Sequence, residues 1–315
     1  MSHRPDSRRF TPDGRAVLVT GASTGLGRAC ALHLEQAGFR VFAGVRKEID
    51  GEEVAAGSAH GRIEPVRIDV TDGPSIREAA AHVSGRLGTD RPLWALVNNA
   101  GVCVSAPLEC VSPERLRWQL DTNVVGQLAV TQAFLPQLRR SRGRIVNVTS
   151  GLGTVAIPFL GAYSAAQFAK EAMSDVLRRE LRDFGVAVSV VQPGAIMTPI
   201  WQKVSEVARD ALHSADSDVA ALYRARFERF LAYNEQQAAE SRTTSQDMAE
   251  AVHRALTEAR PRTRYRVGAD VRRLSLLARL LPDPLLDRYL RPVSAADSSA
   301  GPDPAPAETR PVTRT

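Results

Sequence analysis

Short apolar segments alternate with longer segments of mixed polarity along most of the chain. The apolar segments occupy residues 16–19, 40–45, 66–70, 93–97, 144–148 and 186–191. Apolar runs of this kind are typical of strands in a parallel sheet that is buried on both faces. The intervening segments predict helices, among them 28–37, 74–86 and 113–135. We therefore predict an α/β fold, a doubly wound and mostly parallel sheet with right-handed crossovers.

The two ends of the chain depart from this pattern. Residues 1–14 are polar and rich in arginine, and residues 293–315 are rich in Pro, Ala, Ser and Asp with almost no large apolar side chains. Such segments bury too little surface to offset the entropy of ordering, so we predict a disordered head and a disordered tail. Residues 15–292 between them are predicted to form a single domain.

Composition excludes several classes of protein. No apolar run is long enough to cross a bilayer, and the N-terminus lacks the apolar region of a secretory leader. The three cysteines (Cys30, Cys103 and Cys110) are odd in number and form no C-x-x-C pair, and the histidines show no metal-ligand spacing. We therefore expect no membrane span, no disulfide framework and no metal site, and a reducing, cytoplasmic location.

The charge balance is mildly basic. The chain has 41 Lys and Arg against 35 Asp and Glu, a net charge of +6, and its arginines are scattered and mostly balanced locally. We therefore expect no nucleic-acid partner. Only Lys47, Lys170 and Lys203 are lysines, which is more typical of a coding bias than of a binding surface.

The first apolar segment leads into a glycine-rich turn, Thr20-Gly21-Ala22-Ser23-Thr24-Gly25-Leu26-Gly27. Glycines in a turn between a strand and a helix let backbone N–H groups approach a phosphate, and the helix N-terminus adds partial positive charge. The alternative is a plain strand–helix turn. The position of the turn in the chain favours a nucleotide-binding role.

The end of the second predicted strand bears on the choice of cofactor. NAD-binding proteins place an acidic residue there, but this chain has Arg46 and no acid. A guanidinium is suited to a 2′-phosphate, so the sequence favours NADP(H) over NAD(H). The alternative is that Arg46 is a solvated surface residue.

Several motifs together resemble the short-chain dehydrogenase/reductase family. The glycine turn has the T-G-x-x-x-G-x-G spacing of that family, Asn98-Asn99-Ala100-Gly101 resembles its N-N-A-G motif, and Ser150 precedes Tyr163 by 13 residues, as in the family. The resemblance extends from about residue 15 to residue 290. It implies a single Rossmann-type domain and an oxidoreductase.

The resemblance also implies the site residues. Tyr163 would exchange a proton with the substrate oxygen, Ser150 would hydrogen-bond that oxygen, and Asn123 would support the proton relay. With Gln167, these are the predicted active-site residues. The predicted cofactor-binding residues are Gly21, Ser23, Thr24, Gly25, Leu26, Gly27, Arg46, Asp69, Val70, Asn99, Ala100, Gly101, Tyr163, Pro193, Gly194, Ile196 and Thr198.

Two segments, residues 199–203 and 260–268, look like the retinol and hydroxysteroid dehydrogenase branch. That likeness implies interconversion of a ketone and a secondary alcohol on a bulky apolar small molecule, with NADP(H). Residues around 200–235 are expected to form a lid over the substrate, with a plain packing role as the alternative. The family resemblance further implies a homo-dimer or homo-tetramer.

The chain departs from the family at one position. The family's Tyr-x-x-x-Lys motif reads Tyr163-Ser164-Ala165-Ala166-Gln167 here, so the lysine expected to bind the ribose and lower the tyrosine pKa is a glutamine. Three interpretations follow: a slowed or tuned redox enzyme, an enzyme in which Lys170 replaces the missing cation, or a non-redox catalyst or cofactor-binding protein on the same scaffold. A surface or interface lysine is the alternative for Lys170.

Overall fold

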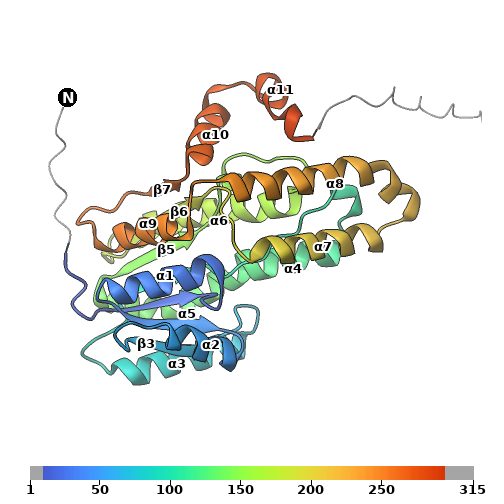
Figure 1. Cartoon of the computed structure of the whole chain (residues 1–315). Coiled ribbons are helices and arrows are strands. Elements are labelled where there is room, and N and C mark those ends of the chain that lie inside the picture. The colour runs from blue at the N-terminus through green and yellow to red at the C-terminus, as the bar shows by residue number, and fades with distance from the viewer. Residues whose placement is uncertain (1–9, 295–315) are drawn as a thin grey trace, which may run out of the picture.

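A parallel sheet forms the centre of the molecule in the computed structural model, which describes residues 10–294 (Figure 1). Within these residues the sheet has seven strands in the order β3-β2-β1-β4-β5-β6-β7, and every neighbouring pair is parallel. The fold is therefore the predicted doubly wound α/β domain. The strands are β1 (Ala16–Thr20), β2 (Arg40–Val45), β3 (Ile63–Arg67), β4 (Ala95–Asn98), β5 (Arg144–Val148), β6 (Ala187–Pro193) and β7 (Arg264–Val267).

Helices cover both faces of the sheet because its central strands present apolar side chains on both sides. In β1, Val17 and Val19 belong to one buried cluster and Ala16 and Leu18 to another. The first cluster includes side chains of α1 (Gly25–Gln36), α2 (Glu48–Ala56) and α9 (Ser245–Thr257). The second includes side chains of α3 (Gly73–Leu87) and α5 (Gly126–Ser141), with α6 (Gly161–Glu180) packed against it.

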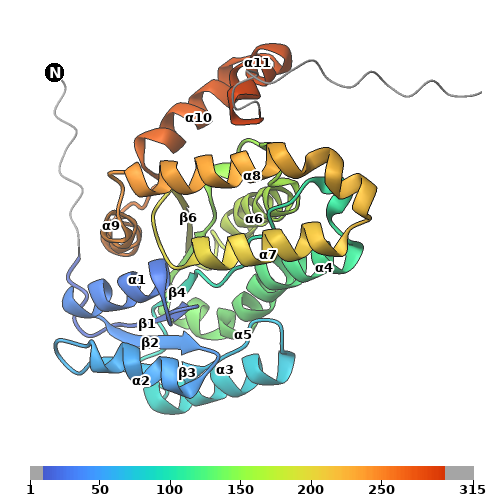
Figure 2. The same cartoon turned by 45° about the vertical axis from the view of Figure 1, so that its right-hand side comes forward.

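In the described part of the chain, four further helices lie beyond the carboxyl edge of the sheet (Figure 2). The helices α7 (Ile200–Ser214) and α8 (Ser217–Glu240) run side by side and share a third apolar cluster centred on Phe227 and Phe230. Farther along the chain, α10 (Ala269–Leu280) and α11 (Asp283–Ser294) follow β7, and α11 contacts α8. These four helices form the roof over the strand ends.

Most predicted elements lie where the sequence pattern put them, with three differences. The third strand covers Ile63–Arg67 rather than residues 66–70, because its pairing with β2 begins at Ile63. The helix predicted over 113–135 is α4 (Pro113–Leu120), a π-helical turn (Asp121–Val125) and then α5. The elements β7, α10 and α11 were not predicted: β7 is a four-residue strand with two arginines, whereas α10 and α11 are amphipathic helices that the strand–helix pattern did not include.

The predicted disordered ends lie mostly outside the described residues. Residues 10–14, assigned to the head, lie against the body: Phe10 N donates to Thr257 O (3.1 Å), and the Phe10 ring packs edge-on against Trp94. Residues 293 and 294, assigned to the tail, belong to α11. None of the helices between residues 10 and 294 has the length and apolar character of a membrane span.

Candidate active site

A cavity of about 1020 Å³ opens where the strands end at their carboxyl edge. Ligands in open α/β sheets bind at this edge. All of the predicted site residues line the cavity, although they come from widely separated parts of the chain. They are Gly21, Ser23, Thr24, Gly25, Leu26, Gly27, Arg46, Asp69, Val70, Asn99, Ala100, Gly101, Asn123, Ser150, Tyr163, Gln167, Pro193, Gly194, Ile196 and Thr198.

The glycine turn forms one end of the cavity, and its backbone leaves no room for side chains. Gly21 and Gly25 have φ angles of +65° and +56°, in the left-handed region that favours glycine. A Cβ atom on Gly27 would collide with the Gly21 carbonyl oxygen and the Asn99 amide. Thr24, which precedes α1, makes no side-chain cap to the helix, so the first N–H groups of α1 are free to meet a ligand.

Hydrogen bonds fasten this turn to the loop after β4. Thr20 Oγ1 accepts from the backbone N–H groups of Asn99 and Ala100, both at 3.1 Å. In return, Asn99 Nδ2 donates to the carbonyl oxygens of Thr20 (3.0 Å) and Gly21 (3.1 Å). The turn and the Asn-Asn-Ala-Gly segment are thus held as one surface, which we call the floor.

Opposite charges lie together next to the floor. Arg46 follows β2 and Asp69 follows β3, and both line the cavity. Burial alone would raise the pKa of Asp69, but hydrogen bonds from Thr71 and the charge of Arg46 hold that pKa below its usual value. Asp69 is therefore an ionised hydrogen-bond acceptor at neutral pH.

The active-site asparagine is oriented by one backbone segment. Asn123 lies in the π-helical turn, a feature often found at functional sites. Its Oδ1 accepts from Val102 N (2.8 Å) and its Nδ2 donates to Val102 O (3.0 Å). Two bonds to the same residue fix the amide plane beside the loop after β4.

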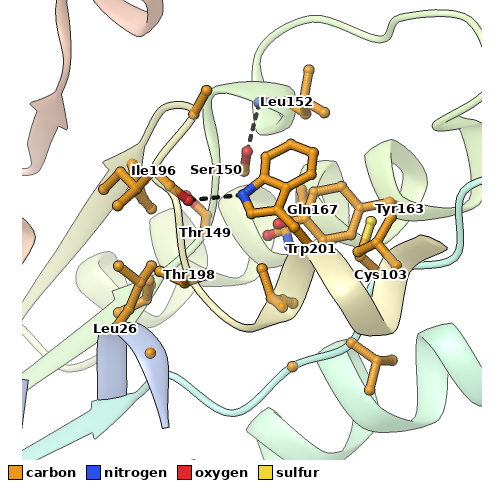
Figure 3. A pocket seen from close by; sticks show the side chains of 18 of the residues that line it. Leu26, Cys103, Thr149, Ser150, Leu152, Tyr163, Gln167, Ile196, Thr198 and Trp201 are labelled. Atoms are coloured by element: carbon orange, nitrogen blue, oxygen red, sulfur yellow. Dashed lines mark hydrogen bonds between the residues drawn. The ribbon is translucent and has the colours of Figure 1, made fainter. Parts of the chain in front are cut away.

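The predicted Ser–Tyr pair lines the cavity (Figure 3), and the two side chains are hydrogen-bonded neighbours. Ser150 follows β5 and accepts from Leu152 N (3.2 Å), while Tyr163 belongs to the first turns of α6. Burial and the neighbouring Cys103 thiol raise the pKa of Tyr163 well above its usual value, although hydrogen bonding to Ser150 and Gln167 counteracts this. The phenol therefore remains protonated at neutral pH.

Gln167 lies one turn of α6 beyond Tyr163 and is buried. Its Oε1 atom is buried without a hydrogen-bond partner among the described residues. A buried amide oxygen without a partner is costly. The residue lines the cavity, so a ligand hydroxyl group can supply the missing donor.

Lys170 is buried rather than at the surface, which corrects the surface-lysine alternative. It is 2% exposed, and Nζ donates to the Val148 carbonyl oxygen at 2.6 Å. Burial lowers the pKa of Lys170 to about 8, against the opposing charge of Glu171. The residue also lines the cavity, together with Val148.

The roof closes the other end of the cavity. Trp201 donates from its indole N–H to Ile196 O (2.9 Å), so the first turn of α7 is tied to the loop after β6 (Figure 3). Ala195 N in the same loop donates to the Asp270 carboxylate of α10 (2.9 Å). Several lining residues were not predicted from the sequence, because no local motif brings distant helices to a cavity: Trp118, Asp270, Leu274, Tyr289 and Leu290.

These features fit a nicotinamide dinucleotide. The glycine turn is a cradle that a single Cβ would fill, the adjoining helix start offers free N–H groups, and Gln167 Oε1 lacks a donor. No cluster of His, Cys, Asp or Glu that could hold a metal ion occurs within residues 10–294.

Comparison with known proteins decides the family. The short chain dehydrogenase family matches residues 15–209, more than half of the chain. The protein is a short-chain dehydrogenase/reductase. It belongs to the branch of this family that contains the retinol and hydroxysteroid dehydrogenases, as the sequence motifs predicted.

Three relatives of this short-chain dehydrogenase/reductase span most of its length. A 3-amino-tetrahydro-pyrrolizinone reductase of Xenorhabdus hominickii is 44% identical and covers 90% of this chain and 97% of its own. A 17-beta-hydroxysteroid dehydrogenase type 6 of Bos taurus is 38% identical, and a retinol dehydrogenase 7 of Mus musculus is 35% identical, each covering 87% of both chains.

A solved structure supports the same family assignment. A short chain dehydrogenase from Burkholderia cenocepacia J2315, in complex with NADP, is 27% identical and superposes with a TM-score of 0.68. The match covers 89% of this chain and 99% of that one. This short-chain dehydrogenase/reductase is therefore an oxidoreductase of a family that uses a nicotinamide cofactor.

Proposed function

We propose that the protein uses NADP(H) to interconvert a ketone and a secondary alcohol on a bulky apolar small molecule. In the reductive direction the ketone carbon gains a hydride and its oxygen gains a proton, so that ketone, NADPH and a proton yield alcohol and NADP⁺. The nicotinamide supplies the hydride. The observation that carries the proposal is the half-buried Tyr163 phenol, which lines the cavity beside Ser150 and whose pKa is raised.

Each active-site residue has one role in this reaction. Tyr163 donates its phenolic proton to the substrate oxygen, and Ser150 hydrogen-bonds that oxygen and orients it. The Asn123 amide is held against Val102 and supports replacement of the tyrosine proton from solvent. The negative charge that develops on the ketone oxygen is neutralised by the proton from Tyr163, so this step requires no metal ion.

The state of Tyr163 favours the reductive direction. A raised pKa keeps the phenol protonated, which is the form that ketone reduction requires, whereas alcohol oxidation requires the phenolate. Reduction at saturating substrate should therefore be nearly flat from pH 6 to pH 8. Oxidation should rise by about tenfold per pH unit over the same range, because the phenolate fraction rises in that proportion.

NADP(H) is the proposed cofactor because of Arg46. This arginine lines the cavity at the end of β2, where a carboxylate would select the unphosphorylated ribose. The Asp69 carboxylate nearby is already engaged by Thr71. A 2′-phosphate would thus meet the arginine at the mouth of the cavity.

The substrate class follows from the wall opposite the cofactor end. Apolar side chains line it, and the proposed lid is formed by α7 and α8. Within this region a bulky apolar ketone would replace water from apolar surface. The wall residues are Leu152, Ile157, Leu160, Val204, Phe230 and Leu231.

A second candidate function is supported by Gln167. This residue brings no charge to Tyr163, so the second candidate is a cofactor-binding protein or a non-redox catalyst on the same scaffold. In that case dinucleotide binding would persist without hydride transfer.

The two functions are separated by binding and turnover measurements. NADPH binding is followed by fluorescence, and NADPH oxidation is assayed with a panel of bulky ketones for the wild type, Tyr163→Phe and Gln167→Lys. We expect all three to bind NADPH and the wild type to turn over a ketone. Tyr163→Phe should lose roughly 10²- to 10⁴-fold in kcat, the usual worth of a general acid.

The Gln167→Lys variant provides the decisive contrast. Turnover in Gln167→Lys but not in the wild type would contradict the proposal and support the cofactor-binding alternative. A Tyr163→Phe variant with an unchanged rate would remove Tyr163 as the proton donor.

We also infer that the protein forms a homo-oligomer. Large apolar side chains are exposed on neighbouring elements, namely Val125 at the π-helical turn (55% exposed) and Phe168 on α6 (44%). Association through this face would remove these side chains from water.

A further inference from the structure

We propose that Gln167 and Lys170 together form a two-residue site for a pair of neighbouring ribose hydroxyls, in which Gln167 Oε1 accepts from one hydroxyl and Lys170 Nζ donates to the other. This inference rests on the proposed dinucleotide function. It makes Lys170 a cofactor-binding residue. Lys170 would then supply the positive charge next to the ribose, because no other cationic side chain of α6 lines the cavity.

The first support is the pair of open hydrogen-bonding positions. Gln167 Oε1 is a buried acceptor without a partner among the described residues. Lys170 Nζ carries three N–H donors, and in the described part of the chain the hydrogen bond to Val148 O uses one of them. An unpartnered acceptor and a donor with capacity left therefore line the same cavity.

The second support is the helical spacing. Lys170 follows Gln167 by three residues, which is about one turn or about 4.5 Å along the axis. Side chains on a helix lean toward its N-terminus, so the long lysine stem extends back toward Gln167. The two polar ends can thus approach neighbouring atoms of one ligand.

The third support is the place where the ammonium is anchored. Asn147 is the last residue of β5 that pairs with β4, and Val148 follows it. The Val148 carbonyl oxygen therefore lies beyond the last β4–β5 residue pair, at the edge of the sheet where the cavity opens. The bond to Val148 holds Nζ at the strand end, two residues before Ser150.

The fourth support is the charge balance around the ammonium. Lys170 forms no ion pair with the described residues, because the neighbouring Glu171 carboxylate is engaged elsewhere: Oε1 accepts from Thr149 and Gln192, and Oε2 accepts from Arg264. A buried cation without an ion pair is costly in an empty protein. A ligand oxygen would offset part of that cost.

The proposal is tested by binding rather than by turnover. Lys170→Gln keeps a donor for Val148 O but removes the charge, and Arg179→Met removes an exposed cation from the same helix. Adenosine 2′,5′-bisphosphate serves as the second probe, because it carries the adenine half of NADPH and lacks the nicotinamide ribose. Dissociation constants for both probes are measured at pH 7 by titration calorimetry.

We expect Lys170→Gln to weaken NADPH binding by about tenfold, the usual effect of losing one hydrogen bond to a charged group. Binding of adenosine 2′,5′-bisphosphate should stay within twofold in both variants, and Arg179→Met should bind NADPH as the wild type does. Equal NADPH affinity in Lys170→Gln and the wild type would overturn the proposal. Equal weakening of both probes would also overturn it, since that result indicates a general structural defect.

A pH series separates a binding role from a structural one. The charged group that acts directly on Lys170 is Glu171, which is bonded to Arg264, and Arg264 is bonded in turn to Asp175. Tyr163, with Cys103 beside it, is the titratable residue of α6 that lines the same cavity. Because Lys170 has a pKa of about 8, wild-type NADPH affinity should fall severalfold between pH 7 and pH 9.5 as the ammonium loses its proton. The Lys170→Gln variant should show a flat profile, and an unchanged slope would contradict the proposal.

The double variant Gln167→Lys/Lys170→Val moves the cation back by one turn. We expect it to bind NADPH within about threefold of the wild type, because a cation from α6 again reaches the ribose hydroxyls. Affinity as low as that of Lys170→Gln would contradict the proposal, because a cation on α6 would then not be what the ribose site requires. A wild-type protein that binds NADPH but reduces no ketone would contradict the proposed reaction. The ribose-site proposal would still be decided by the binding measurements above.

Discussion

The floor and the roof of the cavity are built by different kinds of interaction. The floor is held by backbone geometry and hydrogen bonds, with Gly27 packed against Gly21 and the Asn99 amide tied to two carbonyl oxygens. The roof is held by apolar packing between α7 and α8, with Phe227 and Phe230 at its centre. Backbone geometry tolerates few residue types, whereas apolar packing tolerates many. The floor is therefore suited to a constant cofactor and the roof to a changeable substrate.

The largest effect is expected at the floor, from Gly27→Ala. Its new Cβ would meet backbone and amide atoms that cannot move without opening the turn. We expect NADPH affinity to fall by at least about 100-fold, which corresponds to about 2.7 kcal/mol. Gly85→Ala is the matched control, because Gly85 is also helical and its Cβ would meet no atom nearby. Fluorescence titration with NADPH gives the comparison, and comparable affinities for the two variants would show that the floor is not rigid.

A smaller effect is expected beside the floor, from Arg46→Ala. Loss of a charge-assisted hydrogen bond to the 2′-phosphate should weaken NADPH binding by roughly tenfold to thirtyfold and leave NADH binding within twofold. Arg77→Ala, which removes an exposed arginine from α3, is the control. The measurement is the ratio of the two dissociation constants. An unchanged ratio would return Arg46 to the role of a solvated surface residue.

The smallest effect is expected at the roof, from Leu231→Ala. This side chain lines the cavity from α8, and its truncation should raise the KM of a bulky ketone by about threefold to tenfold. NADPH affinity should stay within twofold. Leu222→Ala is the control because Leu222 lies on the same helix and is 73% exposed. Steady-state kinetics with one bulky and one small ketone would test whether the roof affects only substrate binding. Equal weakening of NADPH binding and ketone binding in Leu231→Ala would contradict this division between floor and roof.

The sequence predicted most of the floor because its motifs reflect local constraints. A left-handed turn requires Gly21 and Gly25, and buried parallel strands require continuous apolar runs. These signals lie within a few residues of one another. The alternation of strands and helices was therefore enough to predict the sheet, and the motif spacing was enough to select residues that all line one cavity.

The roof was predicted only in outline, since its residues meet through tertiary packing. Nothing local in the sequence places Asp270 against the loop after β6, or Leu290 at the cavity wall. The burial of Lys170 was missed for a similar reason. A lysine is rarely buried, so its type predicts the surface, and only the fold brings it beneath the end of β5.

The loop after β6 belongs to both halves of the cavity. It carries Ile196 and Thr198, which face the cofactor end, and it is bonded to Trp201 of the roof and to Asp270 of α10. A dinucleotide that changes the position of this loop would change the affinity for the substrate, and the substrate would then change the affinity for the dinucleotide by the same factor. A search for substrates with the empty protein would therefore measure a substrate affinity that differs from the affinity in the presence of the dinucleotide. Ligand screens on this protein should be run with the dinucleotide present at saturation.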